Sequence, residues 1–152
     1  MKYALTTILV VAALGAAWGQ SESLRVREYN IRKGLAIDGY DPVSYFAGKA
    51  EEGSNKWSTQ YKGITYRFVS MTHRDEFRQN PDRYEPAYGG WCAYAMGDSG
   101  EKVKVDPETF KIIDNRLYLF YNFWGNNTLS TWNKDEATLK KKADTNWKKF
   151  EP

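Results

Sequence analysis

The sequence predicts an α+β domain, in which a small antiparallel sheet of short strands packs with short helices and a C-terminal amphipathic helix. Residues 57–61 and 65–69 each alternate between apolar and polar side chains and flank a short turn, which is typical of a β-hairpin. Residues 111–113 and 117–120 form a second apolar pair across an Asp-Asn turn. Beyond residue 133 the apolar positions recur at helical spacing with lysines between them.

The remaining elements follow from strand and capping signals. Residues 34–38 alternate apolar and small side chains and predict a short strand. Asp41-Pro42 predicts the start of a helical turn, because aspartate caps free N–H groups and proline fits the first helical position. Asp106-Pro107 repeats this pair. Ser70 is the expected N-cap of a helix that stops before Pro81.

The N-terminus has the features of a secretory signal. Lys2 supplies a positive charge, residues 5–14 are apolar, and small residues occupy the two positions that a signal peptidase inspects before a cut after residue 19. The apolar run is too short to span a bilayer, so no membrane span is expected. We therefore predict a signal peptide at 1–19, a polar arm at 20–33 and one domain at 34–150, in a periplasmic or secreted protein.

The charge balance argues against nucleic acid as a partner. The formal net charge is +3, and acidic and basic residues are interspersed along most of the chain. Lysines cluster only at 140–142 and 148–149, where they are expected to form the solvated face of the last helix. With a secretory signal, nucleic acid is not expected as a partner. We expect a monomer whose partner is a metal ion or a small ligand.

The residues whose side chains could bind a metal ion through sulfur or imidazole lie close together in the sequence. The chain has one cysteine, Cys92, and one histidine, His73, and its two internal methionines, Met71 and Met96, lie near them. Thiol, imidazole and thioether groups bind soft and borderline metals such as copper and zinc. The competing interpretation is structural, with the sulfur atoms buried in a core and His73 packed at the start of its helix.

Several motifs in order closely resemble the YHS domain family, in its exported bacterial branch of a signal peptide followed by one such domain. They lie at residues 38–46 (DGYDPVSYF), 61–70 (YKGITYRFVS), 73–77 (HRDEF), 80–84 (NPDRY) and 88–94 (YGGWCAY). The resemblance spans about residues 34–147 and implies a small heavy-metal-binding module. Two cysteines of those modules correspond here to Ser44 and, most closely, His73, so this chain departs from their thiolate-rich pattern.

A copper site is the leading functional hypothesis. Cys92 would supply a thiolate, His73 an imidazole and Met96 a weak thioether, with Met71 as the alternative third ligand. Cu(I) accepts two or three such ligands, whereas a structural zinc site requires four. Asp41 or Tyr40 would orient the imidazole from behind.

Two other classes of function stay open. In a binding module, an aromatic cleft for a small organic ligand or a protein partner would be formed by aromatic side chains, with Cys92 in its wall. These side chains are Tyr40, Tyr45, Tyr88, Trp91 and Tyr94. A thiol enzyme would need Cys92 as nucleophile, His73 as base and Asp41 to orient it, but no recognisable catalytic signature accompanies them. With no second cysteine, Cys92 could also link two molecules.

Overall fold

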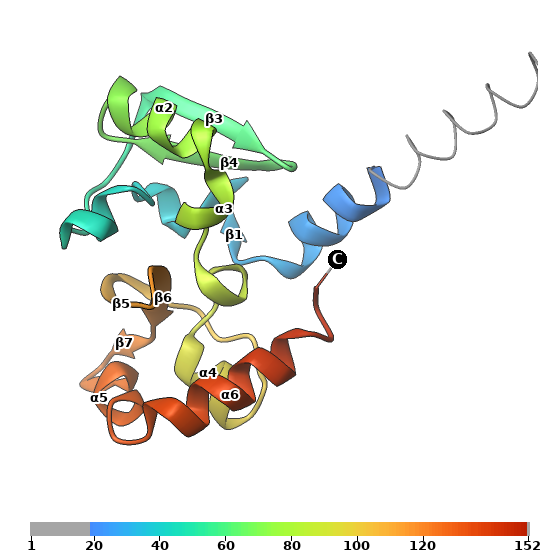
Figure 1. Cartoon of the computed structure of the whole chain (residues 1–152), viewed down its shortest axis with the longest axis vertical. Coiled ribbons are helices and arrows are strands. Elements are labelled where there is room, and N and C mark those ends of the chain that lie inside the picture. Colours follow the sequence, from blue (N-terminus) through green and yellow to red (C-terminus); the bar gives the residue numbers. More distant parts are fainter. Residues whose placement is uncertain (1–18, 152) are drawn as a thin grey trace, which may run out of the picture.

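The computed structural model describes residues 19–151, arranged as two halves along the long axis of the molecule (Figure 1). The upper half in this view is built from the first half of the chain and the lower half from the second. Except for its last residue, the expected signal peptide lies outside the described residues. The structure confirms the α+β class, with short strands, several short helices and a C-terminal helix.

The upper half contains a four-stranded sheet in the order β1-β2-β4-β3. Its strands are β1 (Ile31–Arg32), β2 (Leu35–Ala36), β3 (Ser54–Tyr61) and β4 (Ile64–Phe68). The β3–β4 hairpin forms as predicted, but β2 and β4 run parallel, with Leu35 opposite Thr65. The sheet is therefore mixed rather than purely antiparallel. Strand β3 lies at its edge, and β4, the second strand of the hairpin, pairs with β2 in the same direction.

Helices complete the upper half at the positions that the caps predict. They are the 3-10 turns η1 (Ile37–Gly39) and η2 (Ser44–Ala47) and the α-helices α2 (Met71–Gln79) and α3 (Pro81–Tyr84). The side chain of Ser70 accepts a hydrogen bond from the backbone N–H of His73 at 3.1 Å, which confirms the predicted N-cap. The turn expected at Asp41-Pro42 is η2.

The lower half combines two hairpins with helices. Its elements are η3 (Ala87–Gly90), α4 (Ala93–Asp98), β5 (Asp106–Ile113), β6 (Arg116–Phe120), β7 (Asn122–Phe123), β8 (Asn126–Asn127), α5 (Thr128–Trp132) and α6 (Glu136–Trp147). The β5–β6 hairpin and α6 agree with the sequence predictions. The pair Asp106-Pro107 instead opens β5, where Asp106 accepts hydrogen bonds from the Glu108 N–H and the Thr109 hydroxyl.

Strand β6 separates two hydrophobic cores. Leu117 and Leu119 face the first core, together with Phe68 and Phe77 of the upper half, whereas Tyr118 and Phe120 face the second. Successive side chains of a strand point to opposite sides, so one short strand serves both cores. The second core is closed by Trp132, Leu139, Ala143 and Trp147 from the last two helices.

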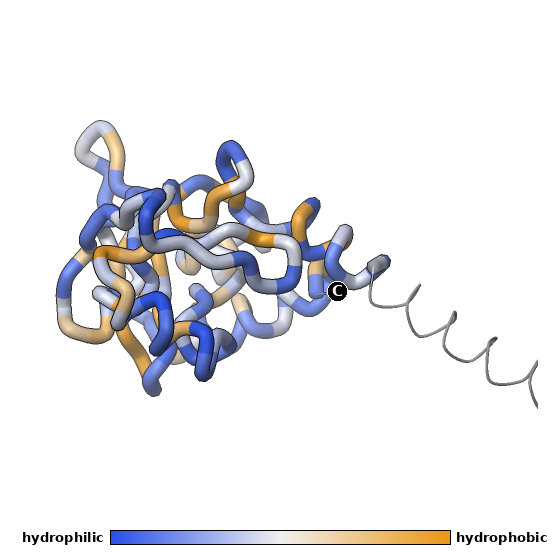
Figure 2. The backbone as a smooth tube through the Cα atoms, turned by 90° about the horizontal axis from the view of Figure 1, so that it is seen from above, coloured by the Kyte–Doolittle hydropathy of each residue, from blue (hydrophilic) through white to orange (hydrophobic). Residues whose placement is uncertain are grey.

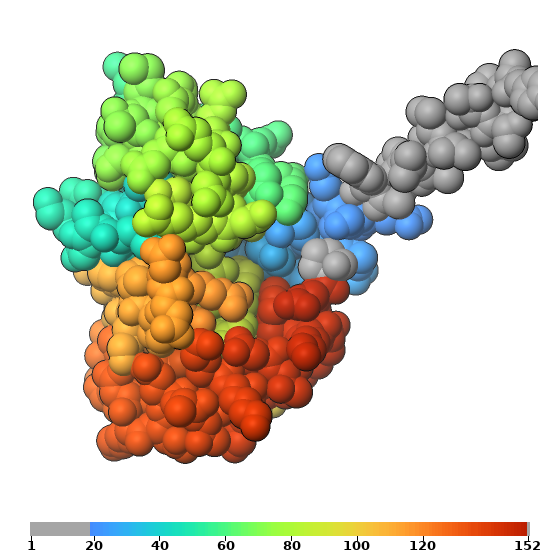
Figure 3. Space-filling model, viewed as in Figure 1, coloured from blue at the N-terminus to red at the C-terminus, as the bar shows by residue number. Residues whose placement is uncertain are grey.

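The segment expected to be a separate arm, residues 20–33, packs against the domain. Residues 19–28 form a helix, and β1 pairs with β2 across the boundary drawn at residue 34. Figure 3 shows this helix beside the C-terminal segment, where the rings of Tyr29 and Trp147 lie 5.8 Å apart. Gly89 makes this contact possible, because a Cβ there would lie 2.9 Å from both rings.

The N-terminal helix is held by a buried ion pair. Arg25 Nη2 lies 2.5 Å from Glu85 Oε1, and both side chains are almost inaccessible to solvent. The same carboxylate accepts a hydrogen bond from the Tyr66 hydroxyl, and Arg25 Nη1 donates to the Tyr29 hydroxyl at 2.8 Å. Arg25 Nε is the one buried side-chain nitrogen or oxygen in residues 19–151 without a hydrogen-bond partner.

This cluster predicts a loss of stability at alkaline pH. Burial, reinforced by the neighbouring Glu85 carboxylate, raises the pKa of the Tyr66 phenol well above its usual value. The folded protein therefore holds this proton more tightly than the unfolded chain, whose tyrosines titrate near about pH 10. The resulting stabilisation is complete below that pH and is lost as pH rises above it. We expect Tyr66→Phe to lessen the fall in unfolding free energy above pH 10, measured by urea titration; an unchanged fall would contradict this assignment.

Candidate functional site

A buried carboxylate, Asp41, joins three segments of the upper half. Its side chain is fully inaccessible to solvent. Oδ1 accepts hydrogen bonds from the backbone N–H groups of Val43 at 2.8 Å and Ser44 at 3.4 Å, which shapes the turn into η2. Oδ2 accepts one from the backbone N–H of Val69 at 2.9 Å, just after β4. The fourth contact is to His73 on α2.

His73 is held against Asp41 by one ring nitrogen. Its Nδ1 lies 2.7 Å from Asp41 Oδ2, and its side chain is 26% exposed. An ionised carboxylate only accepts hydrogen bonds, so Nδ1 carries a proton. In the neutral imidazole the lone pair is then on Nε2, where it can bind a metal ion or accept a proton. The hypothesis that Asp41 orients His73 agrees with this geometry.

Cys92 lies in a different environment. The thiol is fully buried, and its sulfur accepts a hydrogen bond from the Tyr121 N–H at 3.3 Å and lies 3.5 Å from Thr128 Oγ1. The Thr128 hydroxyl donates to the Tyr121 carbonyl at 2.9 Å, so its oxygen is left to accept the thiol proton. The neutral thiol therefore both accepts a hydrogen bond and donates one.

The three expected metal ligands are not brought together. If Cys92 were close enough to share an ion with His73, it would complete a cluster with Asp41, yet residues 19–151 contain no group of three His, Cys, Asp or Glu side chains placed to hold a metal. In Figure 1, α2 and α4 lie in opposite halves. Met96 packs in the second core, with Phe120 and Trp132, whereas Cys92 belongs to the first. Met71, the alternative ligand, is exposed at the start of α2.

These positions also bear on the other roles considered for Cys92. No nucleophile–base pair forms between Cys92 and His73 within the described part of the chain, so a thiol mechanism has no geometric support there. A disulfide between two folded molecules is excluded as well, because the sulfur is buried. Cys92 is a core residue with a satisfied thiol.

The five aromatic residues expected in a cleft do not line one cavity. Tyr45 and Tyr88 are buried, with their hydroxyls donating to the Pro107 carbonyl and to Asp144 respectively. Trp91 donates its indole N–H to the Glu28 carbonyl at 2.7 Å and anchors the N-terminal helix, and Tyr40 donates to Glu108 at 3.2 Å. Only Tyr94 lines a depression together with Cys92. Most of these aromatics therefore stabilise the fold.

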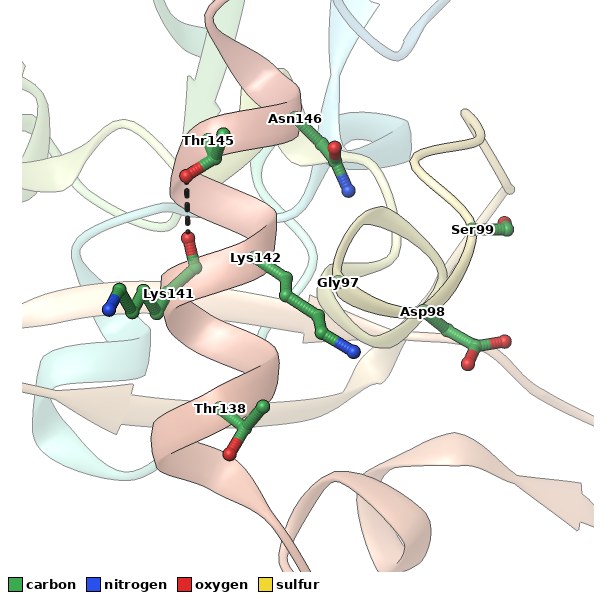
Figure 4. A pocket seen from close by; sticks show the side chains of 8 residues that line it. All are labelled: Gly97, Asp98, Ser99, Thr138, Lys141, Lys142, Thr145 and Asn146. Carbon is green, nitrogen blue, oxygen red and sulfur yellow. Dashed lines mark hydrogen bonds between the residues drawn. The ribbon is translucent and has the colours of Figure 1, made fainter.

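A depression lies between α4 and α6 (Figure 4). Its volume is about 570 Å³, and Lys142 of α6 extends toward α4 and Asp98, whereas Lys141 projects from the other side of α6. These side chains are all exposed, so the depression is a shallow solvated surface rather than a built site. It agrees with the prediction that the lysines of the last helix are solvated.

A hairpin tip that the sequence pattern does not predict is exposed to solvent. Trp124 lies between β7 and β8 with 87% of its surface exposed. Its signal in the sequence is Trp124-Gly125 between Asn122 and Asn126, a glycine turn flanked by asparagines.

No model of a known protein family, no curated protein and no solved structure matches the chain. No helix in the described range is long and apolar enough to cross a membrane. Figure 2 agrees, because apolar and hydrophilic segments alternate along the described chain without a long apolar stretch.

Proposed function

We propose that this is an exported, non-enzymatic protein that binds a soft metal ion, with Cu(I) preferred, through the imidazole of His73. The observation that carries the proposal is the 2.7 Å contact between His73 Nδ1 and the buried Asp41 carboxylate. Histidines that bind metals commonly donate their second ring N–H to a carboxylate, which fixes the tautomer and makes the free nitrogen more basic.

The donor set fits an exchangeable ion rather than a closed site. His73 provides one strong donor at a partly exposed position, and Cys92 is engaged by Tyr121 and Thr128 elsewhere. Imidazole is a suitable ligand for copper, and Cu(I) needs few ligands. Solvent or a partner molecule would complete the coordination, which fits transient handling of metal outside the cytoplasm.

Anaerobic titration of the protein lacking residues 1–19 with Cu(I), against a competing chelator, tests the proposal. We expect one-to-one binding that His73→Ala abolishes. Asp41→Asn should weaken binding about 10- to 100-fold, because the imidazole loses its orienting carboxylate. Cys92→Ala is the matched control and should leave the affinity unchanged.

Two outcomes would overturn the proposal. Binding that persists in His73→Ala would exclude the imidazole as the ligand. Binding that is lost only in Cys92→Ala would assign the metal to the thiol in the lower half instead.

A further inference from the structure

The tip of the β7–β8 hairpin presents a tryptophan in a conformation that its residue type disfavours. Trp124 has φ +52° and Gly125 has φ +78°. A two-residue turn of this kind prefers asparagine or glycine, and a bulky side chain with positive φ is an outlier. The indole recovers little by packing, since it is 87% exposed.

A lysine is associated with the same aromatic surface. Lys104 Nζ lies 4.7 Å from the ring centre of Phe123 and 5.3 Å from that of Trp124. Lys104 is exposed and has no ion-pair partner among residues 19–151. The ammonium group is thus held beside two rings by cation–π attraction, with its charge available to a ligand.

Next to this surface is a cavity of about 330 Å³, within the lower part of the size range of small-ligand sites. It lies between the two halves of the protein. Asn30, Arg32 and Asp38 of the upper half line one side, and Lys104 and Phe123 of the lower half line the other. Sites between two structural units are common positions for ligands.

The lining indicates the chemistry of the ligand. Arg32 pairs with Asp38 at 2.8 Å, which leaves the positive charge of Lys104 uncompensated. The amide of Asn30 and the Arg32–Asp38 pair add hydrogen-bond donors and acceptors, and the exposed indole offers a flat apolar face. A matching ligand would carry one negative charge for Lys104, several hydroxyl groups for the polar lining, and a ring with an apolar face for the indole.

We propose that Trp124, Phe123 and Lys104 form a binding site for an acidic saccharide that carries a uronic acid residue. The sugar ring stacks on the indole of Trp124, its carboxylate pairs with Lys104, and its hydroxyl groups enter the cavity beside Asn30 and Arg32. A membrane surface fits less well, because Trp124 is the one large apolar side chain exposed at the tip, and polar Asn122 and Asn126 lie at the two ends of its turn.

Calorimetric titration with trigalacturonic acid at low ionic strength tests this site. We expect Trp124→Ala and Lys104→Gln each to weaken binding at least tenfold. Lys104→Gln should also flatten the dependence of affinity on salt, since the charge pair is exposed to screening. Maltotriose, which is neutral, should bind at least tenfold more weakly than the acidic trimer.

A second pair of lysine and tryptophan supplies the matched control. Lys56 Nζ lies 4.7 Å from the ring centre of Trp57 on β3, away from this cavity. Trp57→Ala and Lys56→Gln should leave saccharide binding unchanged, as should His73→Ala, which separates this site from the proposed metal site. Trp124→Asn should abolish binding while raising the thermal unfolding midpoint by a few degrees, because asparagine accepts the turn conformation.

Three outcomes would overturn the proposal. One is the absence of binding to trigalacturonic acid by the wild-type protein. Another is equal binding by the wild type and Trp124→Ala. The third is binding to anionic phospholipid vesicles that depends on Trp124 without any binding of the saccharide, which would assign the tip to a membrane surface.

Discussion

Replacing Glu85 with alanine is expected to destabilise the protein by about 3–5 kcal/mol. The carboxylate is the only ion-pair partner of the buried Arg25 guanidinium in the described chain, and it also accepts the Tyr66 hydroxyl. Its removal leaves a positive charge buried beside a nitrogen, Arg25 Nε, that already has no partner. Urea unfolding measures the loss of unfolding free energy. This loss has an upper limit, because the helix at 19–28 can detach and expose the Arg25 charge to water.

Limited proteolysis distinguishes detachment from global unfolding. In Glu85→Ala, cleavage within residues 19–28 should accelerate before cleavage elsewhere. The double variant Arg25→Met with Glu85→Gln should recover much of the stability, since it leaves no unpaired buried charge. Arg32→Ala is the matched control: its pair with Asp38 is exposed, so it should cost less than about 1 kcal/mol. A loss in Glu85→Ala no larger than in Arg32→Ala would contradict the expectation.

Local signals in the sequence predicted most of the elements. The β3–β4 and β5–β6 hairpins follow from alternation of apolar residues around short turns, and the serine cap of α2 follows from its position before the helix. Such signals depend on neighbours within a few residues. They do not specify which strands from distant parts of the chain pair, and the parallel contact between β2 and β4 was missed for this reason.

The N-terminal segment shows the same limit. A polar helix with several charges is typical of a solvated arm, and nothing local indicates that Arg25 is buried. Its partner Glu85 lies 60 residues away, and the receiving surface at Gly89 forms only after the chain folds. The hairpin with Trp124 was missed for a different reason, because its strands have two residues each and carry almost no periodicity.

Of the contacts expected in the candidate site, one is present and one is not. The sequence hypothesis placed Asp41 or Tyr40 behind His73, and it is Asp41 that lies in contact with the imidazole, whereas the Tyr40 hydroxyl donates to Glu108. It also paired His73 with Cys92 because both residue types bind soft metals. Residue chemistry does not encode distance, and the sulfur of Cys92 is instead engaged by Tyr121, which follows β6, and by Thr128, which begins α5.

Replacing Asp41 with alanine is the second change with a large expected effect. It leaves the backbone N–H groups of Val43 and Val69 and the partly exposed ring of His73 without the fully buried carboxylate that accepts their hydrogen bonds. Each buried donor without a partner costs about 1–3 kcal/mol, so we expect a loss of about 3–5 kcal/mol in unfolding free energy, measured in urea. Water that enters the vacated space can accept some of these hydrogen bonds, which keeps the loss near the lower end of the summed free-energy costs.

His73→Ala separates the structural role of Asp41 from its role as an orienting residue. After this change the carboxylate keeps its backbone hydrogen bonds and the removed ring was partly exposed, so the cost should stay below about 1.5 kcal/mol. In Asp41→Asn, nitrogen NMR shifts of the imidazole should show loss of the single tautomer with the proton on Nδ1. A large loss of stability in His73→Ala would instead mean that the imidazole is mainly a structural support for α2. A small loss of unfolding free energy in His73→Ala, together with a tautomer that is fixed only when Asp41 is present, would mean that folding does not need this contact. Its role would then be to leave Nε2 free to bind a ligand.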